Sequence, residues 1–251
     1  MNELKSRVRR GEVCVGGWLT AASGQVAEAL ASCGFDWLAV DMEHGAAGLT
    51  EVESAFVACE RHGVAPLVRL PSGDPILARR VLDLGAHGVI VPQVENAGEL
   101  NDFIGQLVYP PKGRRGVALG RFNAWGDQFT EYFSFEPLIA AQIESPTGVE
   151  QSHEIAALEA VDVLFLGPYD LSAGLGVPGD FDSDRYAAAV ERVRSACQPH
   201  NTALGLHQVT PDGEELRQRI AEGFRFLAYG TDMIALRHAL GEVRQLRNER
   251  R

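Results

Sequence analysis

Lysine is scarce in this sequence, and its scarcity argues against one kind of chemistry. Lys5 and Lys112 are the only lysines, so 21 of the 23 basic residues are arginine. An enzyme that forms an imine with its substrate needs a lysine in a dry pocket. Lys5 lies near the N-terminus and Lys112 lies in a Pro-Pro-Lys-Gly segment, and neither follows a predicted strand. Covalent imine chemistry is therefore not expected.

Basic surface charge, long apolar runs and patterned cysteines are also missing. The formal net charge is −11, whereas nucleic acids and anionic membranes bind basic surfaces, so neither is expected as a partner. No apolar run approaches the roughly 18 residues of a membrane span. We expect no signal peptide, because the charged N-terminal MNELKSRVRR has no apolar core. The four cysteines have no metal-type spacing and fit a reducing compartment, so we expect a cytoplasmic protein.

The sequence does contain eight short apolar segments, each followed by a stretch with helical periodicity. We expect strands at Val13–Leu19, Trp37–Val40, Ala65–Val68, Gly88–Val91, Leu138–Ile143, Val161–Leu166, Ala203–Leu206 and Phe224–Tyr229. Unbroken apolar runs are typical of parallel strands that are buried on both faces. Eight alternations without a linker favour one (β/α)8 TIM barrel domain over residues 1–251; a doubly wound open sheet is the alternative.

Several connecting segments have recognisable limits. Thr50 and Glu53 form the pattern of a capping box for a helix that reaches His62. One helix is expected over Thr147–Leu158, and the last helix over Asp232–Leu246. The segment Tyr109–Gly126 is rich in Gly, Pro and Arg and too long for a simple connector, so we interpret it as a functional or subunit-contact loop.

Two carboxylates follow neighbouring predicted strands in the segment Leu138–Asp170. Glu144 comes directly after the first of these strands, and Asp170 a few residues after the second. A helical crossover makes the two strands parallel, so both acids lie at the same edge of the sheet. Isolated there they would repel each other, and a hard divalent cation such as Mg or Mn would remove the repulsion. Taken singly, Glu144 is better read as a helix cap and Asp170 as a loop acid; as a pair they predict a metal site.

Other polar side chains follow predicted strands. His44, beside Asp41, is either a general base or a histidine that is simply hydrogen-bonded. Asp83 either orients His44 or caps a turn. Arg69 either holds a carboxylate or developing oxyanion, or forms a surface ion pair. No phosphate-binding loop, GxSxG or HExxH pattern is present, and GLGVPG (174–179) opens no immediate helix, so a dinucleotide loop is not expected.

Six motifs together resemble one enzyme family over nearly the whole chain. They are DMEHG, PLVRLP, LDLGAHGVIVPQVENA, YPPKGRRG, QIESPTGVE and VDVLFLGPYDLS. As a set they strongly resemble the metal-dependent (class II) pyruvate aldolases of the HpcH/HpaI family, which includes 4-hydroxy-2-oxoheptanedioate aldolase and 2-dehydro-3-deoxyglucarate aldolase.

The resemblance implies an architecture and a set of roles. The fold would be a (β/α)8 barrel whose last helix is exchanged within a dimer, often in a hexamer that is a trimer of dimers. Glu144 and Asp170 would ligate Mg, Mn or Co, and pyruvate would chelate the ion. Further implied roles are a base for His44 with Asp83 behind it, enolate stabilisation for Arg69, and substrate binding for Asp41, Gln142, Tyr169 and Asp170.

Three departures from the family pattern lie where the aldehyde partner would bind. Ala46-Ala47-Gly48 follows DMEHG, where the family commonly has a proline and a polar residue. Ala124 stands where some members have a second arginine, and His207-Gln208 replaces a more usual apolar pair. These departures leave the pyruvate half of the site intact.

The sequence therefore predicts a homo-oligomeric aldolase that needs a divalent metal and no organic cofactor. It would reversibly split a 4-hydroxy-2-oxo acid into pyruvate, or hydroxypyruvate, and an aldehyde. One rival is an acyl-CoA lyase of the malyl-CoA or citramalyl-CoA type, with Lys112, Arg114 and Arg115 as the only candidates for a CoA pocket. Another is a non-catalytic sensor of 2-oxo acids.

Overall fold

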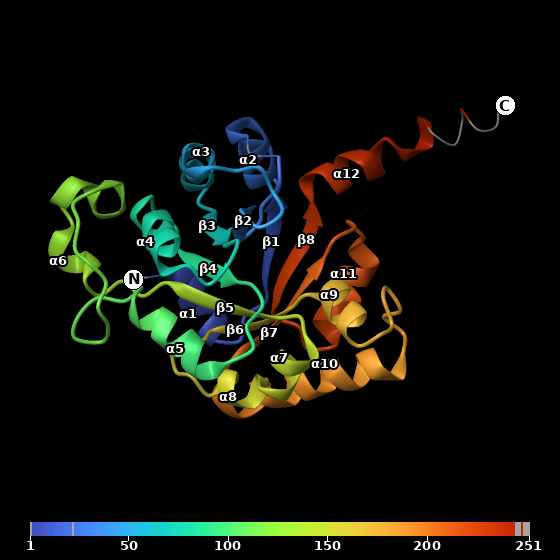
Figure 1. Cartoon of the computed structure of the whole chain (residues 1–251). Coiled ribbons are helices and arrows are strands. Elements are labelled where there is room, and N and C mark those ends of the chain that lie inside the picture. Colours follow the sequence, from blue (N-terminus) through green and yellow to red (C-terminus); the bar gives the residue numbers. More distant parts are fainter. Residues whose placement is uncertain (1, 22, 244–246, 248–251) are drawn as a thin grey trace.

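The computed structural model describes residues 2–21, 23–243 and 247, and its centre is a closed barrel of eight parallel strands (Figure 1). The strands neighbour each other in sequence order, and β8 closes on β1. Their bounds are β1 Cys14–Leu19, β2 Trp37–Asp41, β3 Ala65–Arg69, β4 Gly88–Val91, β5 Leu138–Ile143, β6 Val163–Leu166, β7 Ala203–Gln208 and β8 Phe226–Thr231. The predicted TIM-barrel fold is confirmed.

Helices connect the strands and surround the barrel. They are α1 Glu3–Arg9, α2 Gly24–Ala31, α3 Leu49–Arg61, α4 Pro75–Asp83, α5 Ala97–Gly105, η1 Arg121–Gly126, α6 Phe129–Tyr132, α7 Pro146–Glu150, α8 Ser152–Ala156, α9 Pro168–Gly174, α10 Asp184–Cys197, η2 Gln198–His200, α11 Gly213–Ala221 and α12 Asp232–Ala239. Because each helix returns the chain to the start of the next strand, the carboxyl ends of all eight strands meet at one rim.

Three predicted helix limits differ from the structure. Helix α3 begins at Leu49, and the side chain of Glu51, not Glu53, accepts the bond from the Gly48 amide, so the Thr50–Glu53 capping box is wrong. The helix expected over 147–158 is two short helices that meet at Gln151. Helix α12 is assigned to Ala239, and its expected end at Leu246 lies outside the described residues.

Apolar side chains form two cores, one between the strands and the outer helices and one inside the barrel. Leu4 and Val8 of α1 belong to the inner core, so α1 closes the amino-terminal end of the barrel. The fully buried carboxylate of Asp162 bonds the Lys5 ammonium and the Arg9 guanidinium there, at 2.7 and 2.6 Å. The opposite rim is left open for the site.

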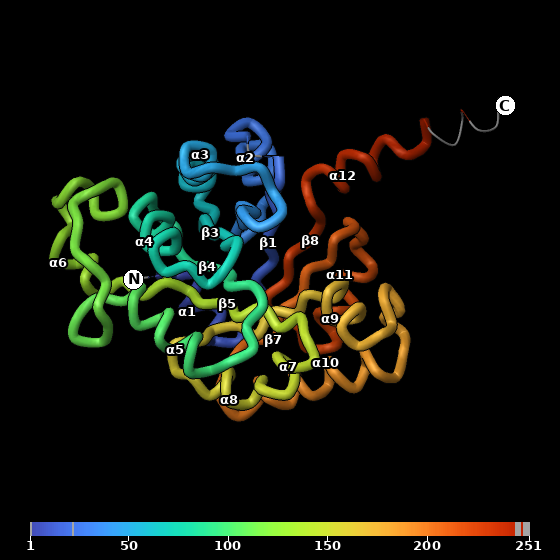
Figure 2. Tube along the Cα trace, in the orientation of Figure 1, coloured from blue at the N-terminus to red at the C-terminus, as the bar shows by residue number. Residues whose placement is uncertain are grey.

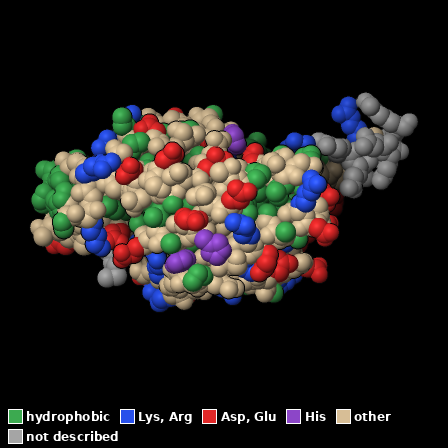
Figure 3. Space-filling view, turned by 60° about the horizontal axis from the view of Figure 1, so that its bottom comes forward, with side chains coloured by type: hydrophobic (Ala, Val, Ile, Leu, Met, Phe, Trp, Pro, Cys, Tyr) green, Lys and Arg blue, Asp and Glu red, His purple; other side chains and the backbone are tan. Residues whose placement is uncertain are grey.

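Two segments extend from the barrel. The chain around η1 and α6 forms a side lobe, and α12 points away from the strands (Figure 2). Figure 3 shows apolar side chains gathered at the end where η1 and α6 lie, and the exposed ones include Val117, Leu119 and Trp125. None of the described helices is long and apolar enough to cross a membrane.

Candidate active site

Two adjoining cavities open at the rim where the strands end. The mouth cavity, of about 410 Å³, is lined by residues that include Trp18, Asp41, Arg69, Gln142, His207 and Thr231. The acidic cavity, of about 310 Å³, is lined by Glu43, His44, Gln93, Glu95, Glu144, Ser145 and Asp170. His44 and Asp170 line both cavities, so the two spaces form one region.

Asp41 and Arg69 are fixed to each other at the ends of adjacent strands, where the β2–β3 register pairs them directly. Arg69 donates to Asp41 through Nε at 3.0 Å and Nη2 at 2.5 Å, and its Nη1 lies 3.0 Å from Glu43 Oε2. Burial alone would raise the pKa of Asp41, but the hydrogen bonds and charge of Arg69 lower it below the ordinary value. Both side chains are therefore charged, and the two hydrogen bonds between them hold the planar guanidinium in one orientation.

Glu144 is held through both of its oxygens. Oε1 accepts from the Gln93 backbone N–H at 2.7 Å, and Oε2 accepts from Gln142 Nε2 at 2.5 Å. Gln93 has a left-handed backbone, with φ of 53°, which is uncommon outside glycine and turns its N–H towards the carboxylate. The following helix is capped by Ser145, whose side chain accepts from the Gly148 amide, so Glu144 does not serve as the helix cap.

Gly167 allows the β6 loop to approach Glu144 closely. A Cβ at this position would lie 2.7 Å from Glu144 Oε2 and 3.0 Å from Gln142 Nε2. The short helix α9 starts directly after Gly167 and carries Asp170 in its first turn. Only glycine therefore lets this loop bring Asp170 to the same cavity as Glu144.

The donors in the acidic cavity fit a hard divalent cation. Burial raises the pKa of Glu144, and the negative charges of Glu43 and Asp170 raise it further. The buried Oε1 of Gln142 has no hydrogen-bond partner among the residues that the structure describes. Within those residues no group of three or more His, Cys, Asp or Glu side chains could hold a metal. Glu144 and Asp170 are two carboxylates, and Mg²⁺ is commonly bound by one or two carboxylates, with water and substrate completing the shell.

His44 lies at the rim as the sequence predicts, but Asp83 does not. The His44 backbone N–H donates to Asp41 at 3.1 Å, and His44 is among the residues that line both cavities. Asp83 ends helix α4, next to the start of β4, and accepts from Arg115 Nη2 at 2.7 Å. Because helices return to the amino ends of the strands, Asp83 lies at the opposite end of the barrel. Within one chain the structure does not bring Asp83 to His44.

Three wall residues received no catalytic or substrate-binding role from the sequence: Trp18, Thr231 and His207, of which His207 alone is expected near the aldehyde partner. The Trp18 ring stacks on the His207 ring, with 4.3 Å between their centroids. The Arg69 guanidinium carbon lies 5.0 Å from the centroid of the Trp18 ring. His207 Nε2 lies 3.2 Å from Thr231 Oγ1. Burial, with help from the charge of Arg69, lowers the pKa of His207 to about 3, so this wall is uncharged at neutral pH. Only the polar character of His207 at a strand end gave a signal in the sequence.

Both lysines are engaged in ion pairs away from this rim. Lys5 pairs with Asp162 at the closed end of the barrel, and Lys112 pairs with Glu136 at 2.5 Å on the surface. Neither residue lines the mouth cavity or the acidic cavity. This placement agrees with the absence of imine chemistry expected from the sequence.

Comparisons with known proteins show the family of this chain. The family model for HpcH/HpaI aldolase/citrate lyase matches residues 15–239. A hydroxypyruvate/pyruvate aldolase of Delftia acidovorans is 36% identical over 95% of this chain and 89% of its own. A 5-keto-4-deoxy-D-glucarate aldolase of Klebsiella pneumoniae is 33% identical over 95% of this chain and 93% of its own. The crystal structure of a HpcH/HpaI aldolase/citrate lyase family protein from Burkholderia cenocepacia superposes with a TM-score of 0.88 at 35% identity, covering 97% of this chain and 100% of that one. The chain therefore belongs to the HpcH/HpaI aldolase/citrate lyase family, and it is a carbon–carbon lyase of the aldolase type.

Proposed function

We propose that this protein is a divalent-metal-dependent aldolase that reversibly cleaves a 4-hydroxy-2-oxo acid into pyruvate, or hydroxypyruvate, and an aldehyde. One observation carries the proposal: Glu144 and Asp170 line a single cavity with His44, and His44 also lines the cavity that contains Arg69. The names of the relatives, which are pyruvate and keto-sugar-acid aldolases, support the same class of reaction.

Glu144 and Asp170 are the residues that would hold Mg²⁺, Mn²⁺ or Co²⁺. When bound, the ion supplies positive charge next to the keto oxygen on which the enolate charge develops. The bonds from Gln93 and Gln142 fix the Glu144 carboxylate before an ion arrives. Gln142 would thus support the ligand, and the amides near Tyr169 and Asp170 would hold the substrate carboxylate. No organic cofactor is needed for this chemistry.

His44 would move the proton. In cleavage it accepts the proton of the 4-hydroxyl group, the C3–C4 bond breaks, and C4 leaves as the aldehyde carbon. The electron pair of the broken bond passes to C3 and the keto oxygen, and protonation at C3 gives the methyl group of pyruvate. In condensation His44 removes a proton from that methyl group. The presence of His44 in the lining of both cavities supports this role.

Arg69 would stabilise the enolate oxygen. The whole residue is only 8% exposed, so its charge acts in a site with little competing water. The sequence predicts a substrate-binding role for Asp41, yet both of its oxygens accept bonds, from Arg69, Trp18 and backbone amides. We therefore propose that Asp41 acts through Arg69 by fixing its orientation.

A CoA-dependent lyase receives less support from the surface. Lys112 is paired with Glu136, and Arg115 is buried against Asp83 and three aromatic rings. Of the three basic residues that could hold CoA, only Arg114 has no ion pair with an acidic side chain among the described residues. The malyl-CoA alternative is tested by measuring cleavage of that thioester beside release of pyruvate from an oxo acid.

We also propose a homo-oligomer in which α12 packs on a second copy. Met233 and Leu236 of this helix and Leu240, which follows its last residue as the C-cap, are exposed at a spacing that places them on one side. Light scattering would measure the mass: a dimer or a hexamer is expected, and a monomer at micromolar concentration would refute the proposal.

The function is tested with a panel of 4-hydroxy-2-oxo acids, with pyruvate release measured before and after chelation. We expect release from at least one member, loss of release with chelator, and recovery when Mn²⁺ is returned. Chelator-resistant release would contradict the metal-dependent proposal, and no release from any member would contradict aldolase activity on this class.

The role of His44 is tested separately by deuterium exchange into the pyruvate methyl group. His44→Ala should slow this exchange by about 10²-fold or more, because a positioned base contributes that much, while Mn²⁺ binding stays intact. His62→Ala is the matched control, because His62 is the C-cap of α3, at the end of this helix away from His44, and the substitution should leave exchange unchanged. Exchange at the wild-type rate in His44→Ala would remove His44 as the base.

A further inference from the structure

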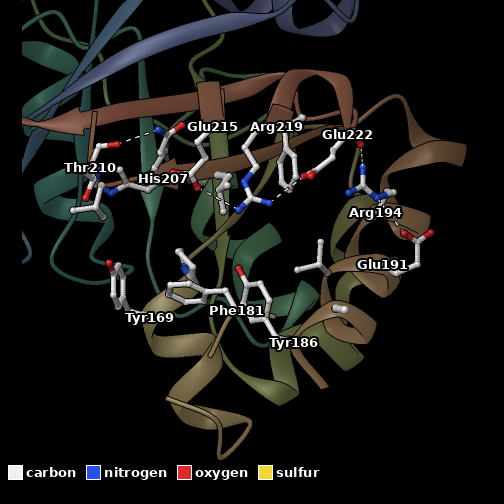
Figure 4. A pocket seen from close by; sticks show the side chains of 17 residues that line it. Tyr169, Phe181, Tyr186, Glu191, Arg194, His207, Thr210, Glu215, Arg219 and Glu222 are labelled. Atoms are coloured by element: carbon white, nitrogen blue, oxygen red, sulfur yellow. Dashed lines mark hydrogen bonds and ion pairs between the residues drawn. The ribbon is translucent and has the colours of Figure 1, made fainter. Parts of the chain in front are cut away.

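A third cavity, here called the outer cavity, lies outside the barrel wall. It is lined mainly by Tyr186, Ala187 and Val190 of α10, Leu206 of β7 and Arg219 of α11 (Figure 4). Its volume is about 440 Å³, within the usual range of pockets that bind small molecules. Neither the metal pair nor the proposed base lies in it.

The outer cavity shares a wall with the mouth cavity. Pro168, Tyr169, His207 and Val209 line both spaces, so these residues separate them at the rim. Tyr169 is 56% exposed, so this wall ends at the surface of the molecule and not in its core. A molecule whose reacting end occupies the mouth cavity can thus extend into the outer cavity.

Aromatic rings form a continuous apolar surface along that route. The ring of Phe181 contacts Tyr169 on one side and Tyr186 on the other, at 5.3 and 5.4 Å between centroids. Figure 4 shows the three rings in a row along one side of the cavity. Val190 and Leu206 add aliphatic surface. Such a surface favours an alkyl or aromatic group over a polar one.

The opposite side of the outer cavity is polar but already charge-paired. Arg219 lies between Glu215 and Glu222, with N–O distances of 3.2 and 3.1 Å (Figure 4). Glu191 and Arg194 also line the cavity, so its charged residues together carry three negative charges and two positive charges. A negatively charged tail would therefore be repelled. Burial raises the pKa of Tyr186 to about 12, so its hydroxyl stays uncharged and can bond a neutral group.

We propose that the outer cavity is a subsite for the distal part of the aldehyde partner. It selects uncharged aldehydes with a long alkyl or aromatic tail, whose carbonyl carbon reacts in the mouth cavity. This inference rests on the proposed aldolase function and adds the class of aldehyde to it.

The test compares two adjacent positions on α10. Ala187 lines the outer cavity, whereas Ala188 lines a different groove beside Arg185 and Arg192, and both alanines are exposed. Condensation of pyruvate with glycolaldehyde and with 3-phenylpropanal is measured, with Mn²⁺ present, in the wild type, Ala187→Trp and Ala188→Trp.

We expect Ala187→Trp to lower kcat/KM for 3-phenylpropanal by about tenfold or more, since even one lost methylene contact costs about that much. The kcat/KM of Ala187→Trp for glycolaldehyde should stay within about twofold of the wild type, because the short substrate does not reach the outer cavity. The kcat/KM of Ala188→Trp should stay within about twofold of the wild type for both aldehydes, because Ala188 does not line the outer cavity. The wild type should use 3-phenylpropanal at least as efficiently as glycolaldehyde.

Two results would overturn the subsite while leaving the aldolase proposal standing. One is an equal effect, or none, of Ala187→Trp on the two aldehydes. The other is a wild type that uses glycolaldehyde but rejects 3-phenylpropanal. If no aldehyde reacts and the pyruvate methyl group takes up no deuterium, the aldolase proposal fails and the subsite fails with it.

Discussion

Replacing His207 by leucine should make the protein more resistant to acid. The imidazole is partly buried between Trp18 and Thr231, and this burial lowers its pKa to about 3. In the unfolded chain the same group has a pKa of about 6.5. As the pH falls below that value, His207 binds a proton in the unfolded chain but not in the folded protein, so the unfolding free energy decreases.

The size of the effect follows from the two pKa values. Between pH 7.5 and pH 5.0 the difference in proton binding should lower the unfolding free energy by about 2 kcal/mol, at 1.36 kcal/mol for each pH unit below 6.5. Leucine takes up no proton in either state, so His207→Leu should lack this contribution. Its size is independent of the packing change that the substitution causes, because that change is present at both pH values.

Urea unfolding at the two pH values, at fixed ionic strength and protein concentration, measures this contribution. The wild type should lose about 2 kcal/mol more than His207→Leu between pH 7.5 and 5.0. Equal losses in the two proteins would refute the account, because they would mean that His207 binds its proton in the folded state as readily as in the unfolded chain.

Three further predictions concern other parts of the barrel. Gly167→Ala should lower kcat by about 10²-fold, since a Cβ 2.7 Å from Glu144 Oε2 would displace this proposed metal ligand. Gly73→Ala, with open space around it, should keep wild-type kinetics. Arg69→Lys should lower kcat/KM for oxo acid cleavage by about 10²-fold, because one ammonium group cannot make both hydrogen bonds to Asp41 and also face the substrate. Wild-type kinetics in this variant would contradict the proposed stabilisation of the enolate by Arg69. Asp162→Asn should cost about 3 kcal/mol in urea unfolding without changing kcat, since it breaks a buried ion pair at the closed end; a changed kcat would link that end to the site.

Much of the fold was predictable because buried parallel strands leave a plain signal. The runs at Gly88–Val91 and Leu138–Ile143 are strands with the predicted limits. Helix limits were less predictable, because competing caps lie close together in the sequence. At α3 the Gly48 amide donates to Glu51 and not to Glu53, and only the backbone geometry determines which of the two glutamates caps the helix.

The site was predictable where a residue directly follows a strand. Asp41 and Arg69 end adjacent strands, so their pairing follows from the parallel register. Contacts that depend on the path of a loop could not be predicted. The left-handed turn at Gln93 and the close approach of Gly167 to Glu144 are of this kind. Asp83 resembled a partner of His44 only as long as the direction of α4 was ignored.

Titration with Mn²⁺, followed by electron paramagnetic resonance, tests the central claim most directly. Glu95→Gln is the matched control, because Glu95 lines the acidic cavity but bonds Ser145. The account predicts that the wild type and Glu95→Gln bind Mn²⁺ and release pyruvate, and that Glu144→Gln and Asp170→Asn lose both properties together. Undiminished Mn²⁺ binding and metal-dependent pyruvate release in Glu144→Gln would contradict it.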